Sequence, residues 1–228
     1  MSLNTTPQIK ICGLTVPEEA RTCAALGADA IGLVFFPPSP RYVNPEQARA
    51  ICNVLPDHVS SIGVFNDPSW EALTDTIDRC GLNGVQLHGS ETPEFIDRLR
   101  AQYNILIIKG LFADREPWLA DAVRYNVTAY LVECGRGPLP GGNAEVWDWG
   151  AACDFASNHP TVLAGGLTPD NVLQAIEACR PDAVDVSSGL EAAPGHKDMA
   201  KVERFIANVR RSPYIYQDSE KSLRPIFL

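Results

Sequence analysis

Residues 8 to 26 read Gln-Ile-Lys-Ile-Cys-Gly-Leu-Thr-Val-Pro-Glu-Glu-Ala-Arg-Thr-Cys-Ala-Ala-Leu. A short apolar run ends near Cys12, and from Pro17 to Leu26 the apolar residues have the spacing of a helix. This stretch therefore predicts a strand followed by a helix. Parallel sheets are built from that unit, because two parallel strands need a long crossover between them.

The same unit recurs along the chain. Further apolar runs rich in Ile, Val and Leu lie at residues 30–36, 61–65, 84–87, 105–109, 129–133, 162–164 and 183–186. Segments with helical spacing follow them at residues 45–55, 70–80, 93–102, 116–125, 146–158, 169–179 and 198–210. Eight units in 228 residues favour an α/β fold, a single (β/α)8 barrel, over residues 8–210. Residues 211–228 form a C-terminal extension that we expect to pack on the barrel, to pack on a second subunit or to be disordered.

An open, doubly wound sheet is the alternative arrangement of such units. It usually carries a Gly-x-Gly-x-x-Gly turn after its first strand. Residues 12–17 instead read Cys-Gly-Leu-Thr-Val-Pro, so the sequence favours the closed barrel.

Composition excludes several classes of protein. The net charge of -9 and the scattered basic residues argue against a nucleic-acid partner, because such proteins cluster Lys and Arg against phosphates. No apolar stretch is long enough to cross a membrane, and residues 1–8 lack the features of a secretion signal. The seven cysteines are an odd number without a Cys-x-x-Cys pair. We therefore expect a cytoplasmic protein without disulfides and without a metal site.

In a barrel of this kind, chemistry gathers where the strands end. The polar and glycine residues that follow the apolar runs are Cys12, Arg41, Asn66, Asp67, His88, Lys109, Glu133, Gly165, Gly166 and residues 185–189. The thiol of Cys12 and the carboxyl group of Glu133 come from opposed strands, so they could divide a proton transfer between a base and an acid. We expect Gly165, Gly166, Ser188 and Gly189 to bind a phosphate through unhindered backbone N–H groups.

Five strings of residues together carry a resemblance to a known family. They are Lys10-Ile-Cys-Gly-Leu-Thr15, Ser39-Pro-Arg-Tyr-Val43, Val85-Gln-Leu-His-Gly89, Leu163-Ala-Gly-Gly-Leu167 and Val184-Asp-Val-Ser-Ser-Gly-Leu-Glu191. In this order and spacing the chain resembles the phosphoribosylanthranilate isomerases of tryptophan biosynthesis. The resemblance implies a TIM barrel that converts N-(5-phosphoribosyl)anthranilate to 1-(2-carboxyphenylamino)-1-deoxyribulose 5-phosphate. This Amadori rearrangement needs no cofactor.

The resemblance also implies roles for single residues. Cys12 would be the general base, and Glu133 would be the general acid at a position where the family usually carries an aspartate. Arg41 would bind the anthranilate carboxylate, since a guanidinium can make two parallel hydrogen bonds to it; a surface salt bridge is the alternative. The segment 141–144, Gly-Gly-Asn-Ala, also departs from the family's Gly-Gly-Thr-Gly.

His88 and Asp185 complete the expected substrate-binding set. We expect His88 to pack or hydrogen-bond at a strand end rather than to carry protons. Asp185 would either bind substrate hydroxyl groups or form an internal ion pair with Lys10 or Lys109.

Two other functions remain open from the sequence. A related sugar-phosphate isomerase of histidine biosynthesis would be expected to carry an aspartate in place of Cys12. The other possible function is a barrel that binds a phosphorylated ligand without catalysis. Its basis is that Glu133 and the loop after it depart from the family's usual sequence. In each case the partner is a small phosphorylated molecule, and the protein is a monomer or a homodimer.

Overall fold

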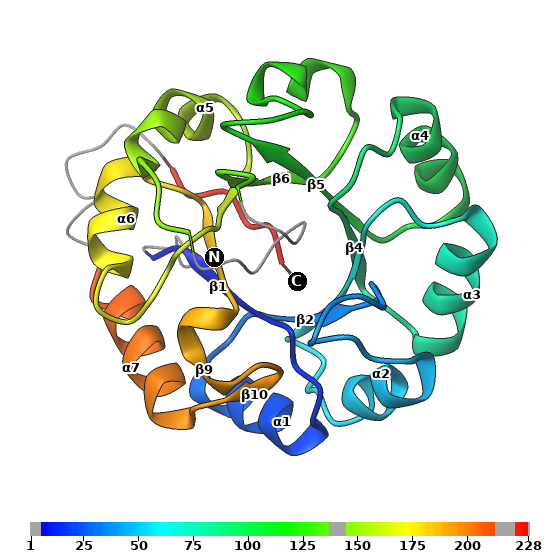
Figure 1. Cartoon of the computed structure of the whole chain (residues 1–228), viewed down its shortest axis with the longest axis horizontal. Coiled ribbons are helices and arrows are strands. Elements are labelled where there is room, and N and C mark those ends of the chain that lie inside the picture. Colours follow the sequence, from blue (N-terminus) through cyan, green and yellow to red (C-terminus); the bar gives the residue numbers. More distant parts are fainter. Residues whose placement is uncertain (1–5, 137–144, 213–221, 228) are drawn as a thin grey trace.

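The protein forms a closed barrel of eight parallel strands inside a ring of helices (Figure 1). The structure is a computed structural model, and it describes residues 6–136, 145–212 and 222–227. The strands pair in chain order, and β1 closes the barrel against β8. They are β1 (Gln8–Cys12), β2 (Ala30–Val34), β3 (Ser60–Phe65), β4 (Gly84–Leu87), β5 (Leu106–Phe112), β6 (Ala129–Glu133), β7 (Thr161–Leu163) and β8 (Ala183–Val186). The closed (β/α)8 fold expected from the sequence is confirmed.

The described helices follow the strands in turn. The α-helices are α1 (Pro17–Leu26), α2 (Pro45–Cys52), α3 (Trp70–Cys80), α4 (Pro93–Gln102), α5 (Cys153–Asn158), α6 (Val172–Cys179) and α7 (Met199–Arg210). The 3-10 helices are η1 (Leu119–Arg124), η2 (Trp149–Ala152) and η3 (Ser188–Leu190). The Asn44 side chain accepts a hydrogen bond from the backbone N–H of Gln47, and the Thr92 side chain accepts one from Phe95. The polar residues before Pro45 and Pro93 therefore cap their helices.

Two expected α-helices have a different form. The segment expected at 116–125 is the short 3-10 helix η1, which is held against β6 because the buried Tyr130 hydroxyl lies 2.8 Å from the carbonyl oxygen of Ala122. The segment expected at 146–158 starts only at η2. The helix begins later than expected because two tryptophans of this segment bond to the loop after β7. Trp147 Nε1 donates to the carbonyl oxygen of Ala164 and Trp149 Nε1 donates to that of Gly165, both at 3.0 Å. These tertiary contacts override the local helical spacing.

Lys109 lies within a strand and not at its end, because β5 continues to Phe112. Its side chain is fully buried, and its ammonium group donates to the carboxylate of Glu91 at 2.9 Å and to the carbonyl oxygen of Gly89 at 2.6 Å. Lys109 therefore ties β5 to the loop after β4, and it is not the partner of Asp185.

The C-terminal segment lies across the end of the barrel at which the strands begin. In Figure 1 the red segment crosses the centre of the barrel. Ile226 and Phe227 are buried among the residues of the barrel interior. The Gln8 side chain accepts hydrogen bonds from the backbone N–H groups of both residues. Residues 222–227 therefore pack on the barrel, while residues 213–221 of the expected extension lie outside the described part.

A small hairpin that the sequence did not predict follows β8. It pairs β9 (Glu191–Ala193) with β10 (His196–Lys197) in an antiparallel sheet. Within the described ranges, no helix has both the length and the apolar character needed to span a bilayer.

Candidate active site

A cavity opens where the barrel strands end. Its walls include all five of the side chains expected to act on or bind the substrate, namely Cys12, Arg41, His88, Glu133 and Asp185. They come from β1, the loop after β2, the end of β4, β6 and β8. The barrel thus brings together residues that are far apart in the sequence.

Cys12 is the last residue of β1 and is 7% exposed. Its neighbour across the sheet is Gly32, and a Cβ atom at Gly32 would lie only 2.6 Å from the Cys12 sulfur. The glycine therefore leaves the space that the thiol occupies. Burial raises the pKa of Cys12, while the nearby ammonium groups of Lys10 and Lys197 act in the opposite direction. The net effect is a raised pKa, and the positive charges of the two lysines favour the thiolate once the proton leaves.

Asp185 forms a buried ion pair with Lys10. The ammonium group of Lys10, which is fully buried, lies 2.9 Å from Oδ1 of Asp185. Burial alone would lower the pKa of Lys10, but Asp185 and Cys12 together, through their charges and hydrogen bonds, outweigh it and the pKa is raised. Lys10 precedes Cys12 by two positions on β1, so the two side chains lie on the same face of the strand. Of the two interpretations of Asp185, the ion pair is present, and its partner is Lys10.

Glu133 is joined to His88. Oε1 of Glu133 lies 3.2 Å from Nε2 of His88, and Nδ1 of His88 lies 3.2 Å from Nε2 of Gln86. Since an amide nitrogen can only donate, Nδ1 is the acceptor in this arrangement, and a neutral His88 carries its proton on Nε2 and donates it to Glu133. His88 is thus a hydrogen-bonded residue at the end of β4, as expected. It orients the carboxyl group opposite Cys12.

Gln86 is a residue of the site that the sequence reasoning missed. It is 3% exposed and lines the same cavity. Its Oε1 atom is buried and has no hydrogen-bond partner among the described residues. A buried acceptor of this kind is costly unless a donor reaches it, so Gln86 offers a contact for a hydroxyl group in the cavity.

A second cavity adjoins the first, and Glu133, Asp185 and Ser187 line both. Three of the four residues expected to bind phosphate line it, namely Gly165, Gly166 and Ser188. The first two have φ angles of +90° and +67°, which favour glycine. Gly189 is not among the lining residues. A Cβ atom there would lie 2.0 Å from the carbonyl oxygen of Leu167, so Gly189 lets the last two loops approach each other.

Arg41 is buried, at 7% exposure, and is paired with a residue that the sequence reasoning did not assign. Its Nε and Nη2 atoms donate to Oε1 and Oε2 of Glu191 at 2.7 and 2.8 Å. The salt bridge of the alternative interpretation is therefore present, but it is buried and does not lie at the surface. Glu191 ends the last of the five quoted strings, which was the only signal in the sequence that could have found it.

The described residues contain no cluster of three or more His, Cys, Asp or Glu side chains that could hold a metal ion. The loop at 137–144, with its Gly-Gly-Asn-Ala departure, lies outside the described residues. The site therefore consists of a thiol, a carboxyl group, buried cations and a glycine-lined cavity.

The chain is similar over most of its length to characterised proteins. A family model described as N-(5'-phosphoribosyl)anthranilate (PRA) isomerase matches residues 9–208. An N-(5'-phosphoribosyl)anthranilate isomerase of Desulfatibacillum aliphaticivorans is 50% identical over 210 residues, which are 92% of this chain and 96% of that protein.

Solved structures agree with these sequence matches. The crystal structure of phosphoribosyl anthranilate isomerase from Thermotoga maritima has a TM-score of 0.81 at 38% identity, and the match covers 90% of this chain and 98% of that one. A phosphoribosyl anthranilate isomerase in complex with reduced 1-(o-carboxyphenylamino)-1-deoxyribulose 5-phosphate has a TM-score of 0.78 at 37% identity, with the same coverage.

Proposed function

Since the chain belongs to the N-(5'-phosphoribosyl)anthranilate isomerase family and is an isomerase of tryptophan biosynthesis, we propose that Cys12 and Glu133 are the base and the acid of its reaction. One observation carries this assignment. The thiol and the carboxyl group line one cavity, and this cavity adjoins a second one lined by glycines. A phosphorylated sugar held between the two groups would present its reacting carbons to both.

The first step is the opening of the ribose ring. Glu133 donates a proton to the ring oxygen as the bond from this oxygen to carbon 1 breaks, and the anthranilate nitrogen supplies the electron pair that forms a C=N bond. The product of the step is an iminium ion and a free hydroxyl group. His88 donates a hydrogen bond to Glu133 and holds its carboxyl group at the place where the proton is needed.

The second step is the removal of the proton from carbon 2. The iminium ion acidifies this C–H bond, and Cys12 takes the proton as a thiolate, leaving an enol that rearranges to the ketone. Lys10 and Lys197 lower the cost of the thiolate by their positive charges. Asp185 pairs with Lys10 and holds its ammonium group in place.

Substrate binding divides between the two cavities. We assign the phosphate to the loops of Gly165, Gly166 and Ser188, which line the second cavity, because backbone N–H groups of such loops bind phosphate oxygens. We assign the anthranilate carboxylate to Arg41 and the ribose hydroxyls to Asp185 and the buried oxygen of Gln86. We further propose that the barrel of residues 8–210 carries the whole site and that the enzyme works in the cytoplasm. The seven free cysteines support a reducing compartment.

The test is an assay with freshly generated phosphoribosylanthranilate. We expect the purified protein to remove the substrate fluorescence well above the spontaneous rate, and Cys12→Ala to lower kcat by about 100- to 10,000-fold. The matched control is Cys23→Ala, which removes an equally buried thiol of α1 outside the cavity. A Cys12→Ala variant as active as the Cys23→Ala control would overturn the assignment of the base.

A further inference from the structure

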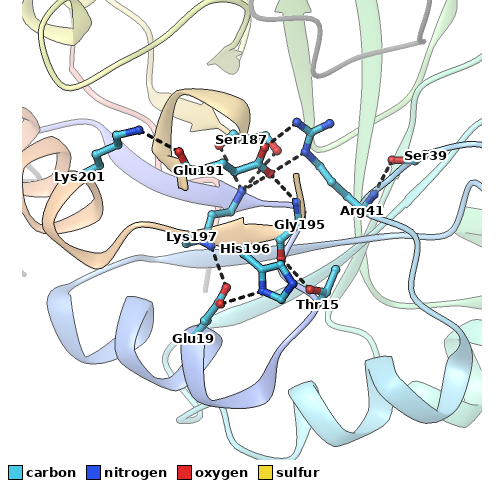
Figure 2. Close-up of polar contacts among 10 residues, drawn as sticks. All are labelled: Thr15, Glu19, Ser39, Arg41, Ser187, Glu191, Gly195, His196, Lys197 and Lys201. Atoms are coloured by element: carbon cyan, nitrogen blue, oxygen red, sulfur yellow. Dashed lines mark hydrogen bonds and ion pairs between the residues drawn. The ribbon is translucent and has the colours of Figure 1, made fainter. Parts of the chain in front are cut away.

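Arg41 and Glu191 are the centre of a polar cluster beside the active-site cavity (Figure 2). Glu191 is the first residue of β9 and accepts hydrogen bonds from two nitrogen atoms of Arg41, in the parallel geometry that guanidinium and carboxylate groups favour. Both side chains are less than one-tenth exposed. A pair so deeply buried holds the guanidinium in one orientation.

A second cation lies against the same carboxylate. The ammonium group of Lys197 donates to Oε1 of Glu191 at 3.1 Å and to the carbonyl oxygen of Ser187 at 3.1 Å, and its side chain is fully buried. Arg41 and Lys197 thus face the single negative charge of Glu191. The three groups together keep one net positive charge beside the cavity, which an anionic ligand would neutralise.

The hairpin holds Glu191 firmly. The backbone N–H of Gly195 donates to Oε1 of Glu191 at 3.2 Å, and the hydroxyl group of Thr15 donates to the carbonyl oxygen of Gly195 at 2.7 Å. The backbone N–H of Lys197 donates to the Glu19 carboxylate of α1 at 2.9 Å. These bonds tie β9 and β10 to the loop after β1 and to α1, so the carboxylate has little freedom to turn.

The pairing with Glu191 leaves one edge of the guanidinium unused. An arginine has five N–H donors, and Glu191 takes one on Nε and one on Nη2. No described residue accepts a hydrogen bond from Nη1, which Figure 2 shows on the side away from Glu191. The remaining edge, formed by Nη1 and the second N–H of Nη2, can therefore bind another carboxylate with two hydrogen bonds.

We propose that Glu191, supported by Lys197, is a positioning residue that presents this second edge of Arg41 to the aryl carboxylate of the substrate. The inference rests on the proposed function, in which Arg41 binds that carboxylate. Glu191 and the substrate do not compete, because they use different edges of the guanidinium. Lys197 offsets the charge of Glu191, so that Arg41 keeps its attraction for the anionic substrate.

Two ligands separate this role from a general effect on folding. One is reduced 1-(o-carboxyphenylamino)-1-deoxyribulose 5-phosphate, and the other is the same compound with a plain phenyl ring that lacks the carboxylate. Their dissociation constants are measured by calorimetry for the wild type and for Arg41→Ala, Glu191→Gln and Lys197→Met. The matched control is Asp182→Asn, since Asp182 is a buried carboxylate that pairs with Arg224 at the opposite end of the barrel.

We expect Glu191→Gln and Lys197→Met each to raise the dissociation constant of the carboxylate ligand by about tenfold, as for the loss of one oriented charge contact. The dissociation constant of the phenyl ligand should rise by less than about twofold. Arg41→Ala should show the same selectivity with a larger loss, and Asp182→Asn should change neither constant. Because an amide can accept from only one of the two arginine donors, Glu191→Gln breaks the paired geometry without removing bulk.

The outcomes distinguish the two proposals. If Arg41→Ala weakens both ligands equally, the carboxylate clamp of the proposed function is wrong, and the role of Glu191 is wrong with it. A second case is that Arg41→Ala weakens binding of the carboxylate ligand more than that of the phenyl ligand, while Glu191→Gln does not. Then the positioning role alone is overturned, whether Glu191→Gln leaves both dissociation constants unchanged, raises both equally or lowers that of the carboxylate ligand. Binding of the phenyl ligand also reports whether each variant is folded.

Discussion

The side chains of His88 and Glu133 reach each other over the strand that separates them. His88 follows the last residue of β4 and Glu133 is the last residue of β6, and their Nε2 and Oε1 atoms lie 3.2 Å apart above β5. Gly110 of β5 makes this possible, since a Cβ atom there would lie 2.8 Å from Nδ1 of His88. The ring of Phe112 packs edge-on against the imidazole. The longer side chain of Glu133 thus has a fixed partner, which a carboxyl group one methylene shorter would not reach in the same way.

We therefore expect Glu133→Asp to impair the reaction even though it restores the residue usual in the family. The shorter side chain moves the carboxyl group away from His88 by about 1 Å or more, and a displacement of that size costs on the order of 100-fold in kcat. Steady-state kinetics on the purified variant check this, with Glu133→Gln as the reference for complete loss of the acid. Wild-type kcat in Glu133→Asp would show that the contact with His88 does not place the acid.

The rate should depend on pH through Cys12. Burial raises the pKa of this thiol, and only the thiolate can accept the proton. In Glu133→Gln, whose amide does not titrate, the residual kcat/KM should therefore rise with pH by up to about tenfold per unit, whereas in the wild type the titration of the acid opposes that of the base. A pH profile measured between about pH 6 and 9 tests this. Cys23→Ala is again the control, because burial raises the pKa of that thiol to about 12 and it lies outside the cavity. A flat profile in Glu133→Gln would contradict the assignment of Cys12 as the titrating base.

The glycine-lined cavity predicts that Gly166→Ala weakens phosphate binding. The added Cβ atom would lie 2.7 Å from the carbonyl oxygen of Glu145, and the φ angle of +67° is strained for alanine. Relieving the overlap shifts the backbone N–H groups of this loop. The loss of one hydrogen bond to a charged group, worth about 1.5–3 kcal/mol, should raise the inhibition constant for inorganic phosphate by about 10- to 100-fold.

Gly81→Ala is the control for Gly166→Ala. Gly81 also has a positive φ angle, of +64°, but nothing lies within 4 Å of the position of a Cβ atom, and Gly81 is outside both cavities. The control should lose stability and leave phosphate inhibition unchanged. Equal inhibition constants for the two variants would contradict the assignment of the phosphate to this cavity.

The C-terminal segment should stabilise the barrel without taking part in the chemistry. Phe227 is 4% exposed and packs inside the end of the barrel that faces away from the active site. Phe227→Ala should lower the free energy of unfolding by about 3 kcal/mol, since it leaves a cavity in a packed interior, and kcat should not change. Urea unfolding measures the difference, with the exposed Ser222→Ala as the control. A fall in kcat without a fall in stability would refute this role.

The sequence predicted the order of the strands and helices well because the relevant signals are local. Apolar spacing identified all eight strands. The prediction from sequence was wrong where groups distant in the chain make contact. The carbonyl groups of the loop after β7 accept hydrogen bonds from Trp147 and Trp149, so the helix expected there begins later in the sequence. A local pattern contains no information about such contacts.

By itself, the sequence determined that the chain is an eight-unit barrel, that Cys12 and Glu133 lie at the ends of strands, and that Arg41 lies in the loop after the second strand. Only the tertiary structure decided what each of these groups touches. Arg41 meets a carboxylate 150 positions away and Lys10 one 175 positions away. Such pairs, and the pKa of the Cys12 thiol with them, depend on closure of the barrel and on burial, because charge interactions depend on distance in space and not on separation along the chain.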